Sequence, residues 1–116
     1  YLKSKDYRLH IITNGFKVVQ AFKIKNSKID HYFDTITDAD LAGVKKPHPF
    51  IFEKALELAN ANVSNSLMIG DSWEADIEGA HRVGLETIYF NEFNQPLPDL
   101  SEVDAVTHLL ELKKYL

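Results

Sequence analysis

The sequence lacks cysteine, long apolar segments and an excess of basic residues. Without cysteine there can be no disulfide framework and no thiolate metal site. There is no run of 18 apolar residues and no signal-peptide pattern, so we expect a cytoplasmic protein without a membrane partner. The formal net charge of −4 argues against a nucleic-acid partner, because binding to a phosphate backbone favours a basic face.

What is present is the composition of one small globular domain. The chain has 116 residues, of which 45% are hydrophobic and 26% charged. Short apolar runs alternate with amphipathic segments, which predicts an α/β fold with a parallel sheet and helices on both faces. The expected strands are 8–12, 35–37, 66–69, 86–90 and 104–106, and the expected helices are 16–25, 49–59, 73–83 and 108–115.

Three further local expectations concern the ends and loops of these elements. Residues 1–5 resemble the tail of a helix, and residues 38–48 read as a loop. In the last helix we expect Thr107 to act as the cap, with Leu109, Leu110 and Leu112 facing inward.

The most informative stretch is residues 67–80. An apolar strand stops at Gly70, Asp71 and Ser72, and a helical pattern follows. Asp71 at the strand end and Asp76 one turn into the helix could both approach one Mg²⁺ ion, which usually takes one or two carboxylates. The alternative is purely structural, because Asp71 and Glu74 also fit a capping box and the helix dipole favours acidic residues in a first turn.

A second candidate segment closes the first expected strand. Thr13, Asn14 and Gly15 would place a hydroxyl, an amide and backbone N–H groups at the carboxyl edge of the sheet, where they could bind phosphate oxygens. A plain strand-to-helix turn explains the same three residues.

A lysine supplies the third candidate. Lys46 lies before Pro47 in a loop that leaves another strand, where its charge could neutralise a phosphoryl group. The alternative is a solvated surface lysine, which is how we interpret its neighbour Lys45.

Together these segments closely resemble the haloacid dehalogenase superfamily of hydrolases. The resemblance rests on the order Ile11-Ile12-Thr13-Asn14-Gly15, then Gly43-Val44-Lys45-Lys46-Pro47, then Ile69-Gly70-Asp71-Ser72 with Asp76, and it runs along the whole chain. It implies that Thr13 hydrogen-bonds the transferring phosphoryl group and that Asn14 helps to hold it. It also implies that Lys46 stabilises charge on the nucleophile and the phosphoryl oxygens. Asp71 would bind Mg²⁺, and Asp76 would bind it directly or through water.

One feature of that family has no counterpart in the sequence. The family nucleophile is the first Asp of an Asp-x-Asp motif that ends a strand before the threonine segment, and Asp38-Ala39-Asp40 lies after that segment, in the wrong loop. We therefore interpret residues 1–116 as the carboxyl-terminal part of a core domain, with the nucleophile strand and the cap lying before Tyr1. By resemblance, that strand would run between the strands that end at Thr13 and Ile69.

The function implied by the resemblance is a Mg²⁺-dependent phosphatase. It would act on small phosphorylated metabolites or nucleotides through an aspartyl-phosphate, with Lys46 and Asp76 as catalytic residues. A sugar-phosphate mutase and a non-catalytic, truncated remnant are the alternatives. We expect Ser72 to order the acidic turn, and Trp73 to be a packing residue rather than a wall of the site.

Overall fold

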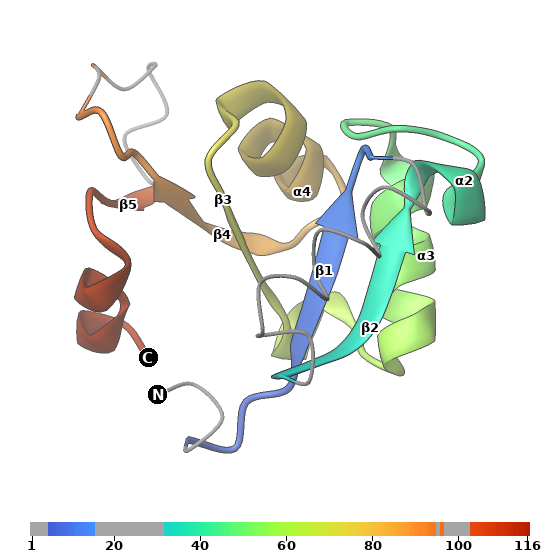
Figure 1. Cartoon of the computed structure of the whole chain (residues 1–116), viewed down its shortest axis with the longest axis horizontal. Helices are drawn as coiled ribbons and strands as arrows, with labels where there is room; N and C mark the ends of the chain where they lie inside the picture. The colour runs from blue at the N-terminus through green and yellow to red at the C-terminus, as the bar shows by residue number, and fades with distance from the viewer. Residues whose placement is uncertain (1–4, 16–31, 95, 97–102) are drawn as a thin grey trace.

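The computed structural model describes residues 5–15, 32–94, 96 and 103–116, which form parallel strands joined by helical segments (Figure 1). The helix expected over residues 16–25 and most of the helix tail expected over residues 1–5 lie outside these residues. The strands are β1 (Leu9–Thr13), β2 (Phe33–Asp38), β3 (Leu67–Gly70), β4 (Glu86–Phe90) and β5 (Asp104–Val106). The helical segments are α2 (Ala39–Ala42), α3 (Pro49–Ala59), η3 (Val63–Asn65), η4 (Trp73–Glu78), α4 (Gly79–Arg82) and η5 (Leu109–Lys114).

The five strands fall into two hydrogen-bonded groups. β1 pairs with β2, and β4 pairs with both β3 and β5, all in parallel. Within the described residues, β1 and β3 are not hydrogen-bonded to each other, so each has a ladder partner on one side. This agrees with the expected separation of the two strands, which by resemblance flank the nucleophile strand.

One apolar core nevertheless joins the two groups. Buried Phe52 of α3 and Ala80 of α4 belong to one cluster, against which Ile12 of β1 and Met68 of β3 pack. A second cluster lies on the other face of β3 and β4, where Leu112 of η5 packs with buried Ile88, Val106 and neighbouring side chains. The β3–β4–β5 group is therefore covered by α4 on one face and by η5 on the other.

Most helix limits follow from local chemistry. Pro49 occupies the first turn of α3, the His48 ring accepts a hydrogen bond from the Phe50 N–H, and Asn60 ends the helix in a left-handed conformation. Gly84 follows the end of α4 with φ of +90°, a conformation that glycine adopts without steric cost.

The structure corrects two of the local expectations. The segment expected as the loop 38–48 contains the one-turn helix α2, because the Asp38 carboxylate caps the Leu41 N–H and Gly43 ends the turn with φ of +77°. In η5 the cap is His108 rather than Thr107, and Leu109 and Leu110 are exposed; only Leu112 of the three expected leucines is buried. The segment is a 3₁₀ helix, whose tighter winding changes which side chains face the sheet.

Candidate active site

Most of the residues singled out in the sequence gather at the carboxyl ends of β1 and β3. β1 ends at Thr13 and β3 ends at Gly70, and both strand ends point to the same edge of the molecule (Figure 1). In open α/β sheets the ligand crevice lies outside this edge. The fold therefore brings three segments to one place: the threonine segment (residues 13–15), the lysine loop (residues 43–47) and the acidic turn (residues 71–76).

A buried ion pair links the two groups of strands. The Lys46 Nζ donates to Asp76 Oδ1 at 2.6 Å, and the side chains are only 12% and 5% exposed. The same ammonium donates to the Ile12 carbonyl of β1 at 3.3 Å. Lys46 is therefore not a solvated surface lysine: its charge is held between the end of β1 and the start of the helix that follows β3.

The acidic turn positions Asp76 through an unusually wide first helical turn. η4 is a π-helix, in which the Ile77 N–H reaches the Ser72 carbonyl at 3.3 Å beside the Asp76 N–H at 2.9 Å. Such turns are rare and occur often at functional sites. The turn folds the Asp76 side chain back onto the strand end, where its Oδ2 accepts the Ser72 N–H at 3.1 Å.

Gly70 makes this arrangement sterically feasible. A Cβ at Gly70 would lie 2.4 Å from the Asp76 Cβ and the Asp76 Oδ2. No side chain can therefore be accommodated there unless Asp76 moves. The Asp76 carboxylate can therefore occupy this position only because residue 70 is a glycine. The sequence indicated a turn at Gly70 but did not reveal this steric role.

The capping-box alternative for Asp71 and Glu74 is wrong. Ser72 is the cap, and its Oγ accepts the Ala75 N–H at 3.2 Å. The expectation that Ser72 orders the acidic turn is thereby confirmed. Asp71 is exposed at the end of β3, where the helix does not use its carboxylate as a cap.

Asp71 lines a small hollow at the carboxyl ends of β3 and β4. The hollow has a volume of about 120 Å³, and its other lining residues are Tyr89, Phe90, Asn91, Glu92 and Phe93. Within the part of the chain that the structure describes, no three acidic, histidine or cysteine side chains group closely enough to hold a metal ion. The two candidate ligands also differ, since Asp76 already accepts two hydrogen bonds whereas Asp71 faces the hollow.

The threonine segment meets the lysine loop directly. Asn14 Oδ1 accepts the Lys46 N–H at 2.6 Å, and Asn14 Nδ2 donates to the Lys46 carbonyl at 3.3 Å. The Gly15 N–H donates to Thr13 Oγ1 at 3.1 Å, which folds the segment into a tight turn. Neither spacing nor periodicity could have revealed the contact between Asn14 and Lys46, because the two residues are 32 positions apart.

Trp73 packs, as expected from the sequence. Its ring meets Tyr89 edge to face, with centroids 5.1 Å apart and planes at 79°, and its indole N–H donates to Glu78 Oε1 at 3.1 Å.

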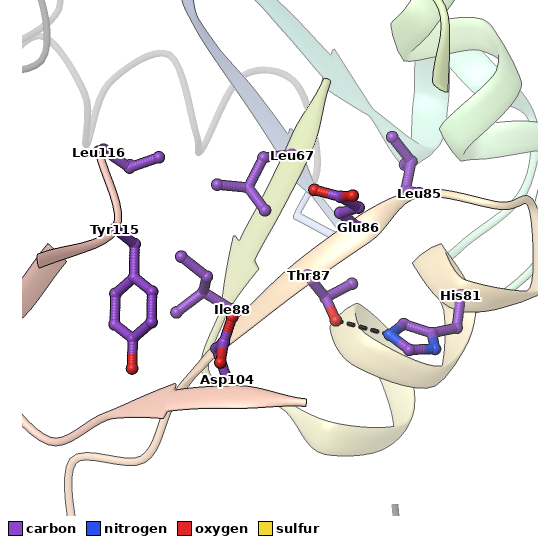
Figure 2. Close-up of a pocket in the computed structure, with 9 residues that line it drawn as sticks. All are labelled: Leu67, His81, Leu85, Glu86, Thr87, Ile88, Asp104, Tyr115 and Leu116. Atoms are coloured by element: carbon purple, nitrogen blue, oxygen red, sulfur yellow. Dashed lines mark hydrogen bonds between the residues drawn. The ribbon is translucent and has the colours of Figure 1, made fainter. Parts of the chain in front are cut away.

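A hollow larger than the one beside Asp71 lies at the other end of the strands. It has a volume of about 420 Å³, and it opens beside Leu67 and Glu86, the first residues of β3 and β4. Figure 2 shows His81 and Thr87, joined by a 2.7 Å hydrogen bond, on one side of β4, with Tyr115 and Leu116 on the other. None of the candidate site residues lines this hollow, so its size does not make it the candidate active site.

Comparison with known proteins agrees with the geometry. A family model described as haloacid dehalogenase-like hydrolase matches residues 1–90. A glyceraldehyde 3-phosphate phosphatase of Pyrococcus abyssi is 46% identical over 89 residues, which are 77% of this chain and 37% of that protein. A pyrimidine 5′-nucleotidase of Escherichia coli is 36% identical over 111 residues, which are 94% of this chain and 49% of that protein.

The solved structures extend the likeness to almost every residue. A HAD-hydrolase of Bacillus subtilis bound to magnesium superposes with a TM-score of 0.86 at 28% identity, covering 98% of this chain and 50% of that one. The chain thus spans half or less of the length of these relatives. No helix among the described residues is both long and apolar enough to cross a membrane.

Proposed function

Because the chain belongs to the haloacid dehalogenase-like hydrolases, we propose that it forms the carboxyl-terminal part of the core domain of a Mg²⁺-dependent phosphatase. Its substrates would be small phosphorylated metabolites or nucleotides, the classes on which the named relatives act. The observation that carries the proposal is the buried ion pair between Lys46 and Asp76, at the edge where Thr13 ends β1. A buried ion pair is costly to form, so stability alone gives little reason for one there.

In this proposal the threonine segment and Lys46 bind the phosphoryl group. The Thr13 hydroxyl and the backbone N–H groups of Asn14 and Gly15 would contact its oxygens, because the Asn14 carboxamide is engaged by Lys46. The Lys46 ammonium, with two of its three donors directed at Ile12 and Asp76, would offer its charge to the nucleophile and to the phosphoryl oxygens.

The acidic turn fits a magnesium ion through its oxygen donors. Asp71, exposed and beside the small hollow, would bind the ion directly; Asp76, whose two oxygens already accept hydrogen bonds, would hold one of its water ligands. When bound, the ion would neutralise charge on the phosphoryl oxygens. Asp76 also holds the Lys46 ammonium in place through their 2.6 Å contact. This contact supports a catalytic role for Asp76 that acts through Lys46.

The nucleophile would come from a strand that completes the sheet between β1 and β3. Two observations support this placement. Each of the two strands has a ladder partner on one side, and every residue of both is only partly buried, whereas Thr87 and Ile88 of β4 are buried. Strands in the middle of a parallel sheet are normally buried on both faces. The inserted strand would convert the two groups into one continuous, Rossmann-like sheet and would carry an aspartate that forms the aspartyl-phosphate.

An activity assay tests this proposal. The protein produced from the natural reading frame, with any residues outside 1–116, should hydrolyse p-nitrophenyl phosphate only with Mg²⁺ present. Glyceraldehyde 3-phosphate and pyrimidine nucleoside monophosphates are the first natural substrates to compare.

The isolated 116-residue chain should show no appreciable turnover, because it contains no candidate for the aspartate nucleophile. Turnover by that chain at about 1 s⁻¹ or more would contradict the proposal, since this is the range of ordinary enzymes. A natural protein that is inactive on all these substrates would instead favour the non-catalytic remnant.

A further inference from the structure

The Asn14 carboxamide is directed at the main chain of a single residue. Its Oδ1 accepts the Lys46 N–H at 2.6 Å, and its Nδ2 donates to the Lys46 carbonyl at 3.3 Å. One side-chain amide thus bonds both polar backbone groups of Lys46, much as a neighbouring peptide unit would in a sheet. These two contacts fix both the position and the orientation of the residue.

The ammonium end of Lys46 is held by strand β1, which directly precedes Asn14. Its ammonium donates to the Ile12 carbonyl at 3.3 Å, two residues before Asn14. The backbone and the tip of the lysine are therefore both anchored to the end of β1, and Asp76 Oδ1, at 2.6 Å, draws the charge toward the acidic turn. Lysine has a flexible stem with four methylene groups, so a direction imposed at both ends removes most of its freedom.

From this geometry we infer that Asn14 is a positioning residue, which aims the Lys46 ammonium at the reacting phosphoryl group. It is not a ligand that contacts the substrate through its carboxamide. The inference rests on the proposed function, because it assigns the means by which the catalytic lysine is oriented. The physical reason is preorganisation: a misplacement of about 1 Å in a catalytic group can cost on the order of 10²-fold in rate.

The first test observes Lys46 itself and needs no activity. Proton–nitrogen NMR of the lysine ammonium groups, in the natural protein, should show a protected Lys46 signal, because that side chain is only 12% exposed and has two acceptors. Asn14→Ala should raise its hydrogen-exchange rate by about tenfold or more, which corresponds to about 1.4 kcal/mol of lost protection.

The matched control is Asn62→Ala. Asn62 also bonds backbone through its side chain, accepting the Ser64 N–H at 3.1 Å, but it caps η3. This variant should leave the Lys46 signal unchanged. If Asn14→Ala also leaves that signal unchanged, the inference is overturned. Should Asn14→Ala not fold, Asn14→Asp keeps the acceptor of the 2.6 Å bond and should show an intermediate exchange rate.

The second test separates positioning from direct substrate contact. In the active protein, Asn14→Ala should lower kcat by about 10²-fold with little change in KM. In a Lys46→Met background the same change should cost less than about threefold, because a residue that acts through the ammonium has nothing left to position. Equal losses in both backgrounds would show direct contact with the substrate and would overturn the inference. A wild-type protein without activity would count against the proposed function alone, and the NMR result would still decide the role of Asn14.

Discussion

The two groups of strands contribute opposite chemistry to the same edge of the molecule. The β1–β2 group, with the loop that follows α2, supplies a hydroxyl, an amide and the ammonium of Lys46. The β3–β4–β5 group supplies the carboxylates of Asp71 and Asp76. No ladder joins the groups within the described residues, and the ion pair of Lys46 with Asp76 links them at this edge. Apart from this ion pair, the two groups are held together by the shared apolar cluster, in which Phe52 of α3 packs with Ala80 of α4.

Removing the charge that links the two groups should have the largest effect. In the active protein, Lys46→Met should lower kcat by about 10²- to 10³-fold, the usual cost of removing one electrostatic donor from a transition state. Lys45→Met, which removes an exposed charge from the adjacent residue, is the matched control and should stay within about threefold of wild type. Steady-state kinetics with p-nitrophenyl phosphate measure both. Comparable losses in the two variants would mean that only the charge of the loop matters.

The second prediction distinguishes the two neighbouring polar residues of the acidic turn. Asp71→Asn should raise the Mg²⁺ concentration that gives half-maximal activity by about 10²-fold, because it removes a charged oxygen ligand. Ser72→Ala removes one cap hydrogen bond, to the Ala75 N–H, and should cost about 1 kcal/mol of stability with a much smaller effect on the Mg²⁺ requirement. A titration of activity with Mg²⁺ checks the order. A larger effect for Ser72→Ala would contradict the metal assignment.

A third prediction compares a glycine from each group. Gly70→Ala should destabilise the protein by about 1–3 kcal/mol through overpacking and should displace Asp76, since the new Cβ would lie 2.4 Å from that side chain. Gly43→Ala has open space around its Cβ and should cost about 1 kcal/mol, from its φ of +77° alone. Urea unfolding gives the two free energies. The protected Lys46 ammonium signal should be lost in Gly70→Ala and retained in Gly43→Ala; retention in both would show that Asp76 tolerates the added methyl group.

The smallest expected effect concerns the Glu111 carboxylate of η5, the helix that covers one face of the β3–β4–β5 group. Hydrogen bonds from the Thr107 hydroxyl and N–H, with one from the His108 N–H, lower the pKa of the Glu111 carboxyl below its ordinary value of 4.5. Because the folded pKa is lowered, the ionised carboxylate stabilises η5 above pH 4.5, and this stability is lost as the pH falls through the folded pKa. Glu111→Gln should flatten the dependence of the unfolding free energy on pH in that acidic range. Identical pH dependence in wild type and variant would contradict the assignment.

Elements whose limits follow from neighbouring residues were predictable from the sequence. The limits of α3 and β4 agree with the expectation, since a proline and a β-rich run, respectively, mark them. The expectations for Leu109 and Leu110 failed because the winding of a short helix depends on what it packs against. The role of Gly70 could not be read from the sequence either, because its neighbour Asp76 reaches it through the π turn.

The amino-acid sequence alone was enough to predict the parallel strands, the family, and the residue types that suit phosphate and magnesium. The contacts among these residues became apparent only in the folded chain. It gave the cap to Ser72 and left Asp71 exposed, buried Lys46 against Asp76, and directed Asn14 at the Lys46 backbone. Local patterns reflect the preferences of a few neighbouring residues, whereas the contacts of Lys46 with Asn14 and Asp76 join segments about 30 residues apart and form only when the shared core has packed.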